Sequence, residues 1–343
     1  MTKRNFILGA VFALATTIGI STLPTVSDAQ EVNWRGAALQ RVDLHWSERW
    51  VWLADQLKEK SGGKFSVELS TFPELGLNGG ELIRLLNTGL MDMGDVVTGY
   101  VSGEVPIFEG AQLPGVYANY NEARAGYAAW EASVVADRGA AVGGRVLTSF
   151  SFGSQFLWST FEMNDLSDLK GKRIRVFAKA QADYLEAFGA IAVNMPLAEV
   201  YSALQLGTVD GAVSGAEYAR GASLWEVVSH VIDLRLGVGA GFMVVSEKSL
   251  AGLDEKQTAV LDSLIPELRD RSWELGKRNT DDGMKVVLEK GIKATVPAKP
   301  EWEVDLLKAT QDAVLVNWAA RAGDGAKEAF NANIAPIVGY EMN

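Results

Sequence analysis

The chain has 343 residues, a formal net charge of −11, 48% hydrophobic residues and no cysteine. This acidic balance excludes nucleic acid as a partner, since phosphate neutralisation needs clustered lysine and arginine. The lack of cysteine excludes disulfides and thiol chemistry, so a buried apolar core must stabilise the fold. A chain of this length has enough residues for two lobes.

Residues 1–29 have the pattern of a secretory signal peptide. Residues 3–4 are basic, residues 6–15 are continuously apolar, and Ser27 and Ala29 are small residues where a signal peptidase reads the chain. An uncleaved N-terminal anchor is the alternative. No later stretch is apolar enough to cross a membrane, so we expect an exported, periplasmic protein that is not itself membrane-spanning.

The first part of the chain alternates between strand and helix patterns. Short alternating apolar runs predict strands, and apolar residues at helical spacing predict helices. The predicted strands are 31–36, 65–69 and 93–97, a helix capped by Ser47 and a helix over 81–87 stand between them, and residues 37–46 form a loop. Alternation of this kind builds a parallel sheet.

The central part repeats this plan. A helix over 123–136 and a strand over 145–151 lead to residues 152–160, which we expect to cross between two lobes. The pattern then predicts strands over 172–176, 192–195 and 209–213, with helices over 181–189 and 198–205 between them. A second parallel sheet follows from this order.

The strand over 172–176 bears the most informative side chain. Its alternation places Ile174 and Val176 on one face and Arg173 and Arg175 on the other. Ligands of parallel sheets sit beyond the carboxyl ends of the strands, so Arg175 should face a crevice. From position alone, a solvated arginine at a strand end is the alternative.

Two segments around this strand resemble a known family. The runs DLKGKRIRV (168–176) and EVYSALQLGTVDG (199–211) are similar to the signature of solute-binding subunits of tripartite ATP-independent periplasmic (TRAP) transporters, the DctP-like family. LGLNGGELIRLLNTGLMDMG (75–94) and YVSGEVPIFEGAQLPGV (100–116) resemble its first lobe. The likeness extends over nearly the whole chain after the signal peptide.

The resemblance implies an α/β, two-lobed periplasmic-binding-protein fold with mixed sheets. The lobes are expected to be discontinuous in sequence, and long C-terminal helices over 254–277 and 301–320 brace their back. The expected lobes are 31–152 plus about 241–280, and 153–240 plus about 281–343.

The same resemblance assigns the candidate ligand contacts. The arginine that corresponds to Arg175 grips a carboxylate, for which a planar guanidinium is suited. Ser214 follows the 209–213 strand, where relatives often use a small polar or amide side chain, and Gln155 or Ser154 stands about where many relatives have a second cation. That exchange places dicarboxylates and sialic-acid-like ligands in doubt. Trp158 is either an aromatic wall of the site or core.

His45 and Trp46 fall where the family's first strand opens onto the cleft, and a loop hydrogen-bonding role for His45 is the alternative. With two histidines and no cysteine, we expect neither a metal site nor a cofactor. The glycine-rich run 237–241 precedes strand-like sequence, which argues against a dinucleotide site.

We therefore expect a binding protein that captures a small organic acid and closes around it. The favoured ligand is a monocarboxylate with an apolar or aromatic tail, such as an aromatic 2-oxo acid; a simple 2-oxo or 2-hydroxy acid or a dicarboxylic acid is the alternative. The resemblance implies small and large integral membrane subunits as partners.

An exported enzyme that acts on organic acids is a further alternative. It would need a base beside Arg175, and no nucleophile or metalloprotease motif is present.

Overall fold

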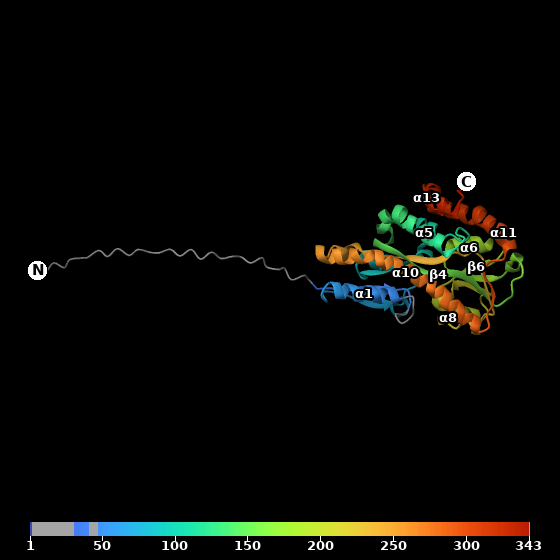
Figure 1. Cartoon of the computed structure of the whole chain (residues 1–343), viewed down its shortest axis with the longest axis horizontal. Coiled ribbons are helices and arrows are strands. Elements are labelled where there is room, and N and C mark those ends of the chain that lie inside the picture. The colour runs from blue at the N-terminus through green and yellow to red at the C-terminus, as the bar shows by residue number, and fades with distance from the viewer. Residues whose placement is uncertain (2–30, 41–46, 343) are drawn as a thin grey trace.

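The computed structural model describes Met1 and residues 31–40 and 47–342. Its strands form a mixed sheet in the order β2-β1-β3-β9-β4-β7-β5-β6, and β8 and β10 pair beside β4 (Figure 1). The first half of the sheet comprises β1 (Val32–Ala38), β2 (Phe65–Thr71), β3 (Met93–Val97) and β9 (Val238–Ser246). The second half comprises β5 (Arg173–Val176), β6 (Ile191–Asn194), β7 (Gly211–Gly215), β8 (His230–Ile232) and β10 (Lys293–Thr295).

Each half contains the parallel pairs that the sequence predicts. β1 runs parallel to β2 and β3, and β5 runs parallel to β6 and β7. The antiparallel strands β4 (Gly144–Ser159) and β9 make the sheet mixed, as the family resemblance implies.

The two halves share one strand. β4 pairs with β9 through its first part and with β7 and β8 through its last part. The predicted strand over 145–151 was therefore too short, because the expected crossing segment continues as the same strand. The pairing with β9 shifts register between Ser151 and Gly153, and Gly153 has a φ of 97°, which favours glycine.

The helices cover the sheet; most differ from the predicted ones by a few residues at each end, and α10 continues twelve residues beyond the predicted 277. The longer ones are α1 (Glu48–Lys60), α3 (Glu81–Thr88), α5 (Tyr120–Trp130), α6 (Lys179–Glu186), α10 (Glu255–Glu289) and α13 (Ala326–Asn333). The shorter ones are α2 (Phe72–Leu75), α4 (Thr98–Val101), α7 (Val200–Gln205), α8 (Ala216–Gly221), α9 (Glu247–Leu250), α11 (Glu303–Ala309), α12 (Val316–Ala322) and α14 (Ala335–Val338).

The predicted C-terminal bracing helices are present. α10 has 35 residues and begins with a capping box in which Asp254 and Gln257 exchange hydrogen bonds. It packs along β4 and reaches both α1 and α8, and Figure 1 shows it extending beside β4. Among the described residues, no helix is both long and apolar enough to cross a membrane.

Two local predictions were wrong. Ser47 precedes α1, but its hydroxyl donates to the carbonyl of Gln40 at 2.9 Å and does not cap the helix. The strand predicted over 209–213 is β7 and covers Gly211–Gly215, two residues later. It begins and ends at glycines, which fit there because neighbouring atoms leave little room for a side chain. Ser214 consequently lies inside a strand and not just past one. Trp50, Trp130, Trp273 and Trp318 are buried core residues, as predicted.

Candidate functional site

A small cavity lies where strands of both halves end. β1, β3 and β5 each end beside it, at Leu39, Val97 and Phe177, and β7 contributes its last two residues. This position agrees with the rule that ligands sit at the carboxyl ends of parallel strands. The cavity measures about 30 Å³, room for one or two water molecules. Its lining comprises Leu39, Val97, Tyr100, Phe152, Gln155, Arg175, Phe177, Leu197, Ser214 and Gly215.

Arg175 provides the positive charge of this cavity. Its side chain is 1% exposed; Nε donates to the Met195 carbonyl at 3.1 Å and Nη1 to the Val213 carbonyl at 2.8 Å. Nη2 is buried and has no hydrogen-bond partner among the described residues. Burial lowers the pKa of Arg175, and no described carboxylate pairs with it. The site therefore presents one unused, fixed donor of a guanidinium, which suits an anionic oxygen.

Aromatic rings of both halves surround this guanidinium. Arg175 Cζ lies 5.2 Å from the centre of the Phe177 ring, and Phe177 meets Tyr100 edge to face at 6.0 Å. Burial raises the pKa of the Tyr100 phenol, whereas its interaction with Arg175 opposes that rise. Tyr218 of α8, whose pKa burial raises to about 12, donates to the Leu197 carbonyl at 3.1 Å. The tyrosines therefore stay neutral donors near the site at neutral pH.

Three of the predicted site residues come together at the cavity, namely Arg175, Gln155 and Ser214. The Gln155 amide nitrogen donates to the Gly153 carbonyl at 3.1 Å and lies against Gly239, where an added Cβ would approach it to 2.5 Å. Gln155 is thus held beside the cavity as a neutral amide. Whether these three residues contact a ligand stays a prediction.

Trp158 lies one layer behind the cavity and does not line it. The indole is fully buried, and its N–H donates to the Ser214 carbonyl at 2.9 Å. The aromatic side chains on the cavity itself are Tyr100, Phe152 and Phe177. Trp158 therefore supports the backbone of Ser214. His45 and Trp46 lie outside the described residues.

The sequence analysis missed the residues that the first half contributes. Tyr100 belongs to α4, the short helix that follows β3, for which the sequence analysis gave no ligand-facing residue. The signal that could have found Tyr100 is its place three residues beyond the end of a parallel strand. Arg173, the first residue of β5, forms a partly exposed ion pair with Asp210 at 2.7 Å.

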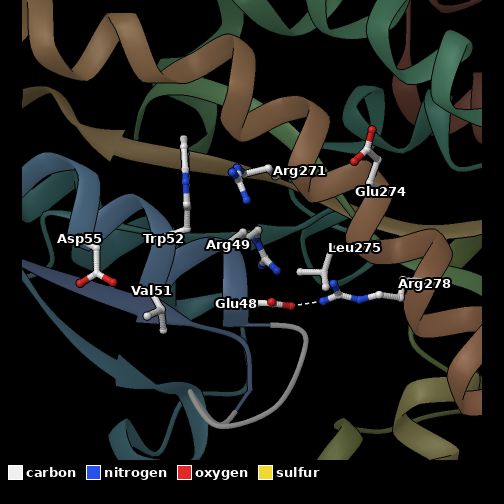
Figure 2. A pocket seen from close by; sticks show the side chains of 9 residues that line it. All are labelled: Glu48, Arg49, Val51, Trp52, Asp55, Arg271, Glu274, Leu275 and Arg278. Atoms are coloured by element: carbon white, nitrogen blue, oxygen red, sulfur yellow. Dashed lines mark hydrogen bonds and ion pairs between the residues drawn. The ribbon is translucent and has the colours of Figure 1, made fainter.

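A wider hollow of about 570 Å³ lies between α1 and α10. Figure 2 shows Glu48, Arg49 and Trp52 of α1 facing Arg271 and Arg278 of α10. Glu48 forms an ion pair with Arg278, and the Arg271 guanidinium lies 4.9 Å from the Trp52 ring centre. Its exposed cations are thus already matched by residues of the chain. Among the described residues, no group of three His, Cys, Asp or Glu could hold a metal ion.

Comparison with known proteins identifies the family. The model of the bacterial extracellular solute-binding protein, family 7 (DctP), matches residues 45–314. The chain belongs to this family of TRAP-transporter solute-binding proteins. The family is one of extracytoplasmic solute-binding receptors.

Relatives of this solute-binding protein include the sialic acid-binding periplasmic protein SiaP of Vibrio cholerae. The two are 24% identical over 254 residues, 71% of this chain and 77% of SiaP. A Bordetella pertussis receptor, DctP7, which binds pyroglutamic acid, superposes with a TM-score of 0.82 at 18% identity, covering 88% of this chain and 99% of DctP7. A Desulfovibrio salexigens TRAP protein with bound orotic acid also gives 0.82 at 18% identity, covering 90% of this chain and 100% of that protein. These structures share the fold.

Proposed function

We propose that this TRAP solute-binding protein captures a small organic acid by pairing its carboxylate with Arg175. The observation that supports this most is that Arg175 lines the cavity and that its buried Nη2 has no hydrogen-bond partner among the described residues. A ligand carboxylate in this position would accept a hydrogen bond from the guanidinium and neutralise its charge. The signal peptide, whose residues are not described, would deliver the protein to the periplasm.

The favoured ligand is a monocarboxylate with an apolar or aromatic tail, such as an aromatic 2-oxo acid. Half of the lining residues, namely Leu39, Val97, Phe152, Phe177 and Leu197, have apolar side chains. Gln155 and Ser214 are neutral hydrogen-bonding groups that can serve a keto or ring carbonyl. A second carboxylate would have no described cation of the lining to meet it, so dicarboxylates should bind more weakly.

Ligand entry requires the two halves to separate, because a cavity of about 30 Å³ is smaller than any such acid. We place the lobes at 31–152 plus about 241–280, and at 153–240 plus about 281–343, with the crossing of β4 at Gly153 as one hinge. Closing then shields the Arg175 pair from water, which strengthens it. The closed form would dock on small and large integral membrane subunits.

We propose a binding role for this site. Among the described residues, the lining contains no Asp, Glu, His or Lys that could act as a base beside Arg175. An exported enzyme that acts on organic acids lacks a candidate base in this part of the chain.

A thermal-shift screen of the protein without residues 1–29 tests the proposal. The panel contains phenylpyruvate, pyruvate, lactate, succinate, pyroglutamate and orotate. Because a ligand at 100 times its Kd stabilises the folded state by about 2.7 kcal/mol, the binding acid should raise Tm by several degrees. We expect phenylpyruvate to give a larger shift than succinate.

The variants Arg175→Ala and Arg173→Ala form a matched pair on one strand. Arg175→Ala should lose the shift, since a shielded arginine–carboxylate pair contributes about 1.5–3 kcal/mol. Arg173→Ala, which breaks only the partly exposed pair with Asp210, should keep it. A panel without any shift, or an unchanged shift in Arg175→Ala, rejects the assignment.

A further inference from the structure

Beside the Arg175 cavity, the two halves also meet between α4 and the start of α6. Gly99 of α4 faces Phe177 and Ala178 so closely that an added Cβ would lie 2.7 Å from the Phe177 ring. The neighbouring backbone of the second half is the start of α6, which begins at Lys179. We call residues 99–109 against 177–181 the inter-half interface.

Helix α6 receives its caps from the other half. Its N-cap residue is Ala178, which has no side-chain oxygen to accept the first N–H groups. Instead, Lys179 N donates to Ser102 Oγ at 3.4 Å and Ala180 N donates to Glu109 Oε1 at 3.0 Å. Both acceptors come from the segment after β3. Separating the halves therefore uncaps α6 and exposes the Glu109 carboxyl group to water.

Glu109 shares its only described cation with a second acid. The Glu109 side chain is 0% exposed, and its Oε2 lies 3.5 Å from Nη2 of Arg321 in α12. Arg321 Nη1 lies closer, at 2.7 Å, to Oδ2 of Asp183 in α6, which also accepts a hydrogen bond from Asn317. The Arg321 guanidinium thus faces two carboxyl groups. It forms the shorter ion pair with Asp183, which is also the more solvent-exposed of the two.

Among the described residues, Arg321 and Asp183 are the charged groups that act on the Glu109 carboxyl, and Lys179 of α6 is exposed. Tyr127 of α5 is a buried neutral phenol near it. α4 contains no acid or cation, and the charged residues of α13, Lys327 and Glu328, are exposed. When the interface is closed and Glu109 is protonated, the positive charge of Arg321 and the negative charge of Asp183 balance each other.

We propose that Glu109 is a positioning residue that couples closing of the cleft to the uptake of one proton. The inference rests on the proposed function, because it requires that the two halves open and close around the ligand. Phe177 connects the two sites: its ring lies beside Arg175, and it stands three residues before Ala180. Glu109 thus acts on ligand capture through the placement of α6 and Phe177.

The direction of the pH effect follows from burial. Burial raises the pKa of Glu109 to about 7 in the closed form, against the lowering effects of the Ala180 N–H and Arg321. Opening admits water, which moves this pKa back toward the ordinary 4.5. The closed form binds the proton more tightly, so closing becomes more favourable as pH falls from about 7 to 4.5, and the effect is lost as pH rises through 7.

Distance measurements between two spin labels test this directly. The chain has no cysteine, so Lys58→Cys in α1 and Glu186→Cys in α6, both exposed, give one label in each half. Without ligand, the ratio of closed to open molecules should rise by up to about tenfold from pH 8 to pH 6. A ratio that is the same at both pH values overturns the proposal.

Glu109→Gln, which resembles the protonated side chain, should give a closed fraction that does not change with pH and is at least as large as that of wild type at pH 6. Glu104→Gln, an exposed acid of the same segment, is the control and should keep the wild-type pH dependence. If Glu109→Gln keeps it as well, Glu109 is not the proton-binding group. Arg175→Ala should lose carboxylate binding yet keep the pH-dependent distance, which separates this inference from the proposed function.

Discussion

Two of the arginines that the structure describes are buried, and they differ in the group that neutralises their charge. Arg49, in the first half, lies 2.6 Å from Asp95 Oδ2, and its guanidinium also sits 4.0 Å from the centre of the Phe150 ring. Arg175, in the second half, donates to two backbone carbonyls and interacts with the Tyr100 phenol, and no described carboxylate forms an ion pair with it. A buried charge with its own carboxylate stabilises structure, whereas a buried charge without one is prepared for an external anion.

Removing the carboxylate of the first pair should have the largest effect. Asp95 also accepts hydrogen bonds from Trp50 Nε1 and Leu39 N, both at 3.0 Å. Asp95→Asn removes the negative charge of this buried ion pair with Arg49, and we expect a loss of about 3–5 kcal/mol in the free energy of unfolding. Urea denaturation measures it. The control Asp262→Asn breaks an exposed pair with Arg145 and should cost less than about 1 kcal/mol.

Giving the second site another cation should change its ligand preference. Gln155→Arg adds a charge beside Arg175, and the closeness of Gly239 should direct the longer side chain toward the cavity. We expect succinate to gain about tenfold in affinity, equal to about 1.4 kcal/mol, relative to phenylpyruvate. Isothermal titration of both acids measures this ratio. An unchanged ratio would show that Gln155 does not face the ligand.

A neutral hydrogen bond at the same site should matter less. Ser214→Ala removes one hydroxyl from the cavity and leaves the Trp158 contact to the Ser214 carbonyl intact. The affinity for the acid found in the screen should fall by about 1 kcal/mol, or roughly fivefold. Titration at constant pH measures this change, and Ser202→Ala, on α7 away from the cavity, provides the unaffected control.

The smallest effect should be on stability at Arg175 itself. Arg175→Met loses two hydrogen bonds to carbonyls but also removes an unneutralised buried charge. The free energy of unfolding should stay within about 1 kcal/mol of wild type, although carboxylate binding is lost. If Arg175→Met lowers the free energy of unfolding as much as Asp95→Asn does, Arg175 is a structural residue and does not differ from Arg49 in role.

The sequence was sufficient to predict the strands within each half and the cavity residues that lie near them along the chain. Alternation around Arg175, the parallel strand order and the family-like runs predicted the correct sheet and three of the cavity residues. Residues that depend on how the halves meet were not predictable, because no periodicity brings Tyr100 to Phe177. The two-residue error at β7 has a related cause: Gly211 and Gly215 lack strand propensity, yet close packing against Trp158 and Gln155 requires small residues there.

The strand shared by both halves also constrains how the chain folds. β3 and β4 both pair with β9, so the first half of the sheet cannot be completed until residues 238–246 are available. Those residues follow the entire β5–β7 unit in the sequence, which gives the first half contacts of long sequence separation. Neither half has all its strands in one continuous segment, so they should melt together in a single calorimetric transition.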